Sequence, residues 1–184
     1  MVLGGTRSGK SSVAERLLSE MPAPHTYVAT ATFDLDDADM SVRVERHRRR
    51  RPLTWESVEA GSDLTKALRS IHGSVLVDAL GTWVASSEQF EVDIEAVCSA
   101  LRERSGDTVL VSDEVGMGVH PSTEIGRRFR DALGELNQAV AKIADHMFLV
   151  VAGRVMPLQA IDSIDYKSIR AEEDRATEDK AVQD

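Results

Sequence analysis

Short apolar runs and longer amphipathic stretches alternate along most of this chain. Apart from a two-residue run at the start, the apolar runs are five or six residues long and rich in Val, Leu and Thr, which is typical of buried strands. They occupy residues 2–3, 26–31, 74–78, 108–112 and 146–151. Because the first run is shorter than a usual buried strand, we expect the native chain to begin upstream of Met1.

Between these runs, apolar residues recur with the spacing of amphipathic helices. The pattern predicts helices over residues 11–21, 38–50, 90–104 and 124–144, and a short helix marked by Leu64, Leu68 and Ile71 that ends at Gly73. Strands that alternate with helices indicate an α/β fold, in which a mostly parallel sheet is flanked by helices through right-handed crossovers. Ligands of such folds bind at the carboxyl ends of the strands.

The periodic pattern ends near Leu158, and this boundary divides the chain into two predicted parts. Residues 1–158 carry all the expected strands and helices, and we expect them to form one compact domain. Residues 159–184 are highly charged and lack a sustained apolar period, which predicts a frayed helix or a solvated tail.

Composition restricts the class of protein. The chain has 184 residues, of which 42% are hydrophobic and 29% charged, as in ordinary globular domains. The net charge of −9 argues against non-specific binding to nucleic acid or to an anionic membrane. One cysteine, Cys98, excludes an internal disulfide and suits a reducing compartment, and no apolar run has the length of a membrane span. We therefore expect a cytoplasmic protein without membrane insertion or a nucleic-acid partner.

The strongest chemical signal follows the first apolar run. Residues Gly4–Ser11 read GGTRSGKS, which contains G-x-x-x-x-G-K-S between a strand and a helix, the context of a phosphate-binding P-loop. Gly4 and Gly9 allow the loop to curl and to direct its N–H groups inward, and the helix that follows adds the positive end of its dipole. Lys10 is predicted to contact the β- and γ-phosphates, and the Ser11 hydroxyl to ligate Mg²⁺.

Two other apolar runs end in carboxylates. Asp78 ends the run 74–78 as in a Walker-B strand, whose Asp holds Mg²⁺ directly or through water. By itself Asp78 is also consistent with a helix cap or a plain strand-end carboxylate, but the upstream P-loop favours metal or nucleotide contact. Asp113 and Glu114 follow the run 108–112, and the sequence leaves open whether they ligate a metal, act as a base or cap the turn into Gly116.

A basic stretch in the second predicted helix is also unusual. His47 lies among the arginines of residues 46–51. One interpretation is a polyphosphate clamp around a nucleophilic imidazole that attacks an α-phosphorus and forms a phosphoramidate. The alternatives are a solvated basic helix face and a nucleic-acid patch, and the acidic chain disfavours the second of these.

Taken together, these motifs resemble the bifunctional adenosylcobinamide kinase / adenosylcobinamide-phosphate guanylyltransferase family of cobalamin biosynthesis. The P-loop is close to the family's GGARSGKS, and residues 43–59 are similar to R-I-x-x-H-R-x-x-R-P-x-x-W-x-x-x-E, with Val44 in place of the Ile. Residues 113–118 are similar to N-E-V-G-M-G, and residues 127–138 to R-x-F-R-D…N-Q. Asp113 replaces the family's Asn and would add a negative charge near the phosphates. The resemblance covers about residues 2–156.

The resemblance implies a RecA-like P-loop fold, a homotrimer and two reactions. GTP or ATP would phosphorylate adenosylcobinamide; GMP would then pass from GTP, through a covalent bond to His47, to adenosylcobinamide phosphate, giving adenosylcobinamide-GDP and pyrophosphate. His47 and Lys10 would be catalytic, with Mg²⁺ on Ser11 and Asp78. The residues implied in nucleotide contact are Gly4, Gly5, Thr6, Arg7, Ser8, Gly9, Lys10, Ser11, Ala29, Thr30, Ala31, Arg48, Arg49, Arg50, Arg51, Glu59 and Asp78.

Two other functions match parts of the same pattern. A plain P-loop kinase of small molecules would use residues 46–51 as a lid and would form no covalent intermediate. A nucleotide-binding regulatory protein would bind GTP without catalysis, although a sensor does not need the reactive histidine segment.

Overall fold

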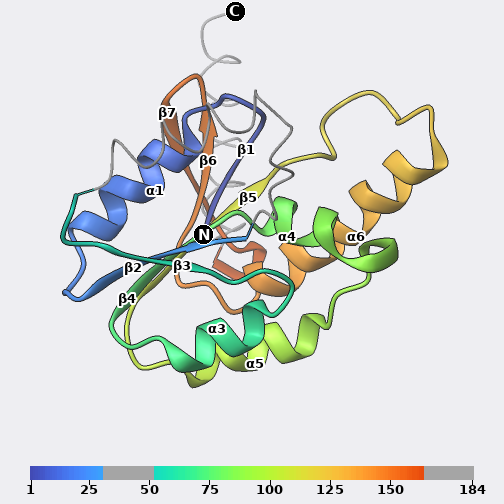
Figure 1. The fold of residues 1–184 in the computed structure, drawn as a ribbon. Helices are drawn as coiled ribbons and strands as arrows, with labels where there is room; N and C mark the ends of the chain where they lie inside the picture. Colours follow the sequence, from blue (N-terminus) through green and yellow to red (C-terminus); the bar gives the residue numbers. More distant parts are fainter. Residues whose placement is uncertain (31–51, 164–184) are drawn as a thin grey trace, which may run out of the picture.

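A seven-stranded sheet runs through the part of the chain that the computed structural model describes, which is residues 1–30 and 52–163 (Figure 1). The strand order is β3-β2-β4-β5-β1-β6-β7, and all neighbours are parallel except β6 and β7. This arrangement confirms the predicted α/β, RecA-like P-loop fold. The strands are β1 (Val2–Gly4), β2 (His25–Ala29), β3 (Glu56–Glu59), β4 (Ser74–Asp78), β5 (Thr108–Asp113), β6 (Met147–Val151) and β7 (Arg154–Leu158).

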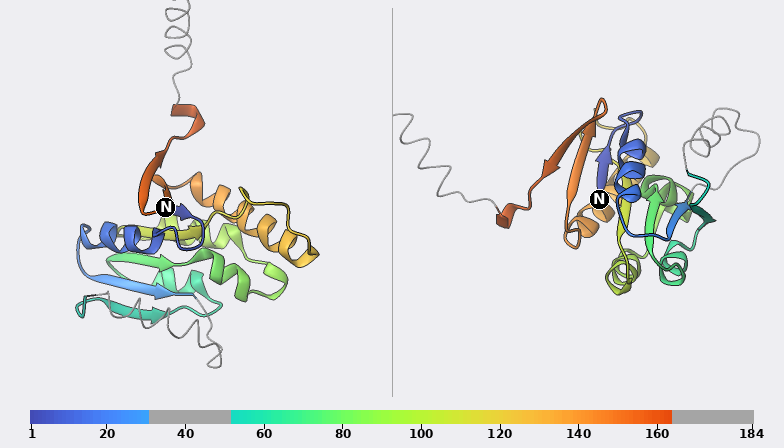
Figure 2. Two further views of the ribbon diagram at one scale, coloured as in Figure 1. Left: turned by 90° about the horizontal axis from the view of Figure 1, so that it is seen from above. Right: turned by 90° about the vertical axis from the view of Figure 1, so that its left-hand side faces the viewer.

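Helices cover both faces of this sheet (Figure 2). On one face lies α1 (Lys10–Ser19), which directly follows β1. The helices of the other face are α3 (Leu64–Ser70), α4 (Leu80–Ser86), α5 (Ile94–Glu103) and α6 (Glu124–Ala141). Two short 3-10 turns, Glu88–Phe90 and Ile161–Ser163, complete the described elements.

The central strands are apolar along their whole length because both of their faces are buried. In β4, Leu76 packs into the core under α1, whereas Val75 and Val77 point into the core under the other helices. Leu18 of α1 and Leu136 of α6 are fully buried in these two cores. Burial on both faces therefore explains the continuous apolar runs. The polar residues lie where the strands end, outside the buried layer.

Several predicted bounds agree with the structure and others differ for local reasons. β4 has the predicted bounds 74–78, and α6 begins at Glu124 as predicted. The helix predicted from residue 90 instead begins at Ile94, because the Asp93 side chain accepts a hydrogen bond from Ala96 N at 2.9 Å and thereby caps it. α6 ends at Ala141 rather than at residue 144, and β2 ends at Ala29 rather than at residue 31.

Apart from the 3-10 turns, three elements were not predicted: β3, of whose four residues three are exposed, α4 and β7. α4 has only seven residues, and β7 is an edge strand whose residues are all exposed, so neither shows a clear apolar period. Pro157 lies within β7, which an edge strand tolerates because one side of its backbone needs no partner. The predicted helix 38–50 and the tail from residue 164 lie outside the described residues. Among the helices that are described, none is long and apolar enough to cross a membrane.

Candidate active site

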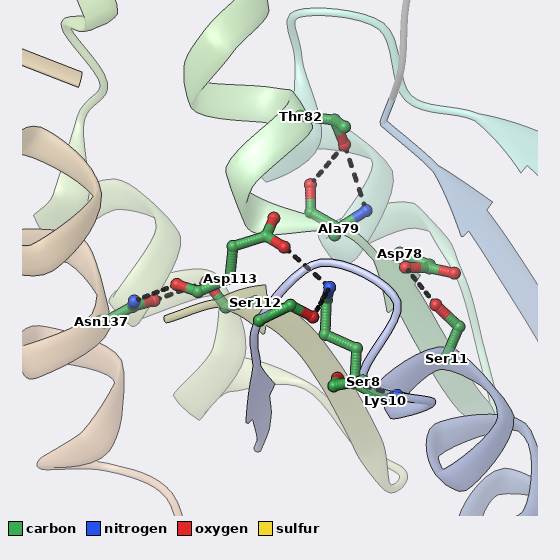
Figure 3. Close-up of polar contacts among 10 residues, drawn as sticks. Ser8, Lys10, Ser11, Asp78, Ala79, Thr82, Ser112, Asp113 and Asn137 are labelled. Atoms are coloured by element: carbon green, nitrogen blue, oxygen red, sulfur yellow. Dashed lines mark hydrogen bonds and ion pairs between the residues drawn. The ribbon is translucent and has the colours of Figure 1, made fainter. Parts of the chain in front are cut away.

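The loop between β1 and α1 is tightly curled at the carboxyl edge of the sheet (Figure 3). Ser8 N donates to the Gly5 carbonyl oxygen at 3.2 Å. Gly9, which precedes α1, has a φ of 95°, a left-handed conformation that favours glycine. Gly4 has no room for a side chain, because a Cβ would lie 2.5 Å from Ser8 Oγ and 2.7 Å from the Val150 carbonyl oxygen. The two motif glycines are thus required for different reasons.

The turn between β6 and β7 supports this loop from outside. Gly153 N donates to the Ser8 carbonyl oxygen at 2.7 Å, and a Cβ on Gly9 would lie 3.3 Å from Gly153 Cα. Sequence reasoning missed this contact because it missed β7. The available signal was Gly153 between two apolar segments, because glycine favours tight turns. In the structure Ala152 and Gly153 both have positive φ, as in two-residue hairpin turns.

The P-loop lysine is paired with a carboxylate of the neighbouring strand. Lys10 Nζ lies 2.7 Å from Asp113 Oδ1 and donates to the Gly5 carbonyl oxygen at 3.3 Å (Figure 3). The two side chains are 13% and 28% exposed, so the ion pair is largely withdrawn from solvent. The sequence singled out both residues, but only the packing of β1 against β5 brings them together.

The two residues predicted to ligate a metal also meet. Ser11 Oγ donates to Asp78 Oδ1 at 3.3 Å, and the Tyr27 hydroxyl donates to Asp78 Oδ2 at 3.0 Å. A hydroxyl and a single carboxylate form the donor set that Mg²⁺ uses when phosphate oxygens and water complete its shell. Within the described residues no group of three or more His, Cys, Asp or Glu side chains forms a metal site of its own. The side chains present therefore suit Mg²⁺ that arrives with a nucleotide.

Other predicted contact residues line up along the same edge. In the strand registers, Ala29 lies beside both Glu59 and Asp78, so the last residues of β3, β2 and β4 form one row. The hydroxyl of Thr30, which follows β2, is buried and bonded to the Ala79 backbone and to Thr82 Oγ1. The Thr30 side chain thus fastens β2 to the start of α4.

The structure separates the roles that the sequence left open after β5. Glu114 accepts hydrogen bonds from Gly116 N at 2.8 Å and from Met117 N at 3.1 Å, so it caps the turn. Asp113 instead points to Lys10. Asn137 of α6 accepts from Ser112 Oγ at 2.6 Å and donates to the Asp113 carbonyl oxygen at 3.1 Å, which fixes the end of β5.

A nucleotide site built on a P-loop lysine, with a second carboxylate on β4, is common to many enzymes, and comparison with known proteins decides among them. The model of the cobinamide kinase / cobinamide phosphate guanyltransferase family matches residues 1–158. The chain belongs to this family. The family assignment confirms the predicted enzyme class, a kinase combined with a nucleotidyltransferase of cobalamin biosynthesis.

Curated relatives of the same family match nearly their whole length. The bifunctional adenosylcobalamin biosynthesis protein CobP of Pseudomonas aeruginosa is 38% identical over 168 residues, which cover 86% of this chain and 96% of that protein. The corresponding CobU protein of Escherichia coli K12 is 33% identical over 175 residues, which cover 83% and 95%. Among solved structures, an ATPase of a bacterial type III secretion system has a TM-score of 0.49 at 10% identity, over 92% of this chain and 59% of that one.

The family motifs fall partly inside and partly outside the described residues. The carboxyl ends of the strands carry the P-loop motif together with Ala29, Thr30, Glu59 and Asp78. Ala31, the catalytic candidate His47 and the arginines of residues 48–51 lie outside the described residues. Their roles stay predictions. Trp55, the tryptophan of the family motif in residues 43–59, is 9% exposed and packs in the core beside His25, with ring centroids 5.7 Å apart.

Proposed function

We propose that this chain phosphorylates adenosylcobinamide with GTP or ATP and then transfers GMP from GTP to the phosphorylated product through His47. The observation that carries the proposal is the meeting of Lys10, Ser11 and Asp78 at the carboxyl edge of the sheet, in a chain of the cobinamide kinase / guanyltransferase family. Adenosylcobinamide and its phosphate are the proposed substrates.

In the kinase step, the substrate hydroxyl oxygen attacks the γ-phosphorus. The new O–P bond forms as the bond from that phosphorus to the β-phosphate oxygen breaks, the nucleoside diphosphate leaves with the electron pair, and the hydroxyl proton passes to water. Lys10 stabilises the charge that develops on the β- and γ-phosphate oxygens, and the curled backbone of Gly4–Ser11 directs N–H groups toward them. Mg²⁺ held by Ser11 and Asp78 would neutralise further phosphate charge when bound.

In the second reaction, a neutral imidazole nitrogen of His47 attacks the α-phosphorus of GTP. An N–P bond forms and pyrophosphate leaves; a phosphate oxygen of adenosylcobinamide phosphate then displaces the imidazole and takes the GMP. Support comes from the chain path, because β2 ends at Ala29 on the same edge as Asp78, so the chain enters residues 31–51 from the nucleotide side. The arginines around His47 would neutralise the pentavalent transition state.

The test is incubation with GTP labelled at the α-phosphorus. The wild-type protein should retain acid-labile, alkali-stable label, as expected of a phosphoramidate, and His47→Asn should retain none. His120→Asn is the matched control, since His120 lies on an exposed loop and contacts Arg130 at 3.0 Å. Release of the label on addition of adenosylcobinamide phosphate would establish that the intermediate is productive.

A parallel assay with γ-labelled nucleotide follows the kinase step. Transfer of label to adenosylcobinamide should be lost in Lys10→Ala and kept in Lys66→Ala, which removes an exposed lysine of α3. Phosphorylation without any label from the α-phosphorus on the protein would support the plain kinase and overturn the guanylyl step. Nucleotide binding with neither transfer would support the regulatory protein. We also propose a homotrimer, which light scattering of the full chain would test.

A further inference from the structure

The Asp113 carboxylate is paired with the lysine that a nucleotide bound at the P-loop would need for its phosphates. An ammonium group has three donors, and in Lys10 the Asp113 carboxylate at 2.7 Å and the Gly5 carbonyl oxygen at 3.3 Å occupy two of them. A triphosphate that binds the P-loop must therefore share or replace the carboxylate of Asp113.

The Asp113 carboxylate is carried on a short side chain at the fixed end of β5. The backbone of Asp113 pairs with Gly4 in the β1–β5 register, and its carbonyl oxygen accepts from Asn137 Nδ2 at 3.1 Å. The side chain is also confined, because a Cβ added to Gly81 at the start of α4 would collide with Asp113 Oδ2. Lys10 carries its charge on a flexible four-carbon stem. When phosphate arrives, the lysine is the partner that can move.

We propose that Asp113 is a positioning residue that competes with the terminal phosphates for Lys10 and so weakens the binding of nucleotides in proportion to the phosphate charge they place there. Two effects act in the same direction. The ion pair with Lys10 is lost or lengthened on binding, and the fixed carboxylate repels the phosphate oxygens that approach the same ammonium group. The inference rests on the proposed binding of GTP at the P-loop.

The chemical consequence is easier release of charged products. A nucleoside diphosphate and pyrophosphate both leave this site after the proposed reactions, and a carboxylate poised at 2.7 Å from Lys10 offers the lysine a replacement partner as they depart. Removing the Asp113 charge should therefore tighten both substrate and product, and product release should slow.

The test measures the affinity of GTP, GDP and GMP by calorimetry for the full chain and for Asp113→Asn. We expect GTP to bind about 5- to 10-fold more tightly to the variant, GDP less so and GMP equally, because a monophosphate places the least charge at Lys10. Asp113→Ser provides a second neutral side chain. Asp107→Asn is the matched control, since Asp107 is exposed and precedes β5 at the opposite end of the same strand. That variant should leave all three affinities unchanged.

Each outcome decides the matter. Equal or weaker GTP binding by folded Asp113→Asn would overturn the inference. An equal gain in affinity for GMP and GTP would also overturn it, because a general change in the loop would alter the affinities for all three nucleotides alike. An equal gain in Asp107→Asn would assign the effect to net charge and would also overturn it. If the wild-type chain binds no GTP at all, the proposed function fails first, and this inference fails with it.

Discussion

Ser11 Oγ donates a hydrogen bond to Asp78 Oδ1 at 3.3 Å, which joins the first turn of α1 to the end of β4. The Tyr27 hydroxyl donates to the other oxygen of the same carboxylate at 3.0 Å. The Ser11 hydroxyl and the Asp78 carboxylate, which lie far apart in the sequence, thus meet at the P-loop. These two groups are the protein ligands that we propose for Mg²⁺.

Replacing Asp78 with Asn should raise the Mg²⁺ concentration required for phosphoryl transfer by about 10- to 100-fold, because the amide keeps the shape of the side chain but removes its charge. The measurement is kinase rate against Mg²⁺ concentration. Tyr27→Phe removes only one neutral donor to this carboxylate, so it should shift the Mg²⁺ dependence by less than Asp78→Asn. An unchanged requirement in Asp78→Asn would exclude Asp78 as a ligand.

Two adjacent glycines of the P-loop should respond differently to the same substitution. Gly4→Ala should lower the free energy of unfolding by about 1–3 kcal/mol, because its Cβ would lie 2.7 Å from the fixed Val150 carbonyl oxygen. Gly5→Ala should change it by no more than about 0.5 kcal/mol, because a Cβ there meets nothing within 4 Å. Urea unfolding of both variants measures the difference, and equal losses would contradict the close approach at Gly4.

Arg104 stabilises the edge of the sheet opposite the nucleotide site. Its guanidinium donates to Thr108 Oγ1 at 3.0 Å and to three backbone carbonyl oxygens, at 2.6–3.0 Å, of Leu68, Ile71 and Gly73. We expect Arg104→Met to lower the free energy of unfolding by about 2–3 kcal/mol, because these partly buried carbonyls lose a charged donor.

The matched control for Arg104 is Arg102→Met. Arg102 pairs with Glu95 at 3.4 Å on the exposed surface of α5, and surface pairs of this kind contribute little. Its loss should change the free energy of unfolding by about 0.5 kcal/mol or less. Similar losses in the two variants by urea unfolding would show that the carbonyl contacts of Arg104 do not stabilise the fold.

Cys98 should be protected from thiol reagents in the folded protein. The residue is 2% exposed, and burial raises the pKa of its thiol; Arg102 acts in the opposite direction and Glu95 in the same direction as burial. The reaction of the native protein with a disulfide reagent at pH 8 should be roughly 100-fold slower than that of the protein in denaturant, because the thiolate is the reactive form and is hidden.

The raised pKa of Cys98 also makes the stability of the folded protein depend on pH. Because the folded pKa of Cys98 lies above the unfolded one, the folded state favours the neutral thiol. This contribution is intact below the unfolded pKa and is lost as the pH rises through it toward the folded value. Cys98→Ala should therefore flatten the fall in stability above about pH 8.5. An equally steep fall in the variant would contradict the assignment.

Much of the fold follows from the sequence, because burial on both faces of a parallel sheet leaves a continuous apolar run that is visible locally. β4 was predicted residue for residue, and β5 and α6 were predicted to begin where they do. The P-loop was equally clear, since its glycines and Lys10 are required by local backbone geometry and by phosphate charge. The polar residues that end the strands also followed from the pattern.

What the sequence did not determine depends on contacts between distant segments. α4 and β7 are too short or too exposed to carry an apolar period, and their positions are fixed by the elements beside them. The support of Ser8 by Gly153 and the pairing of Lys10 with Asp113 join residues that no local pattern connects. Strand order decides them, because β1 lies between β5 and β6 in the sheet. Local residues thus specified the chemistry available, and tertiary packing decided which groups meet.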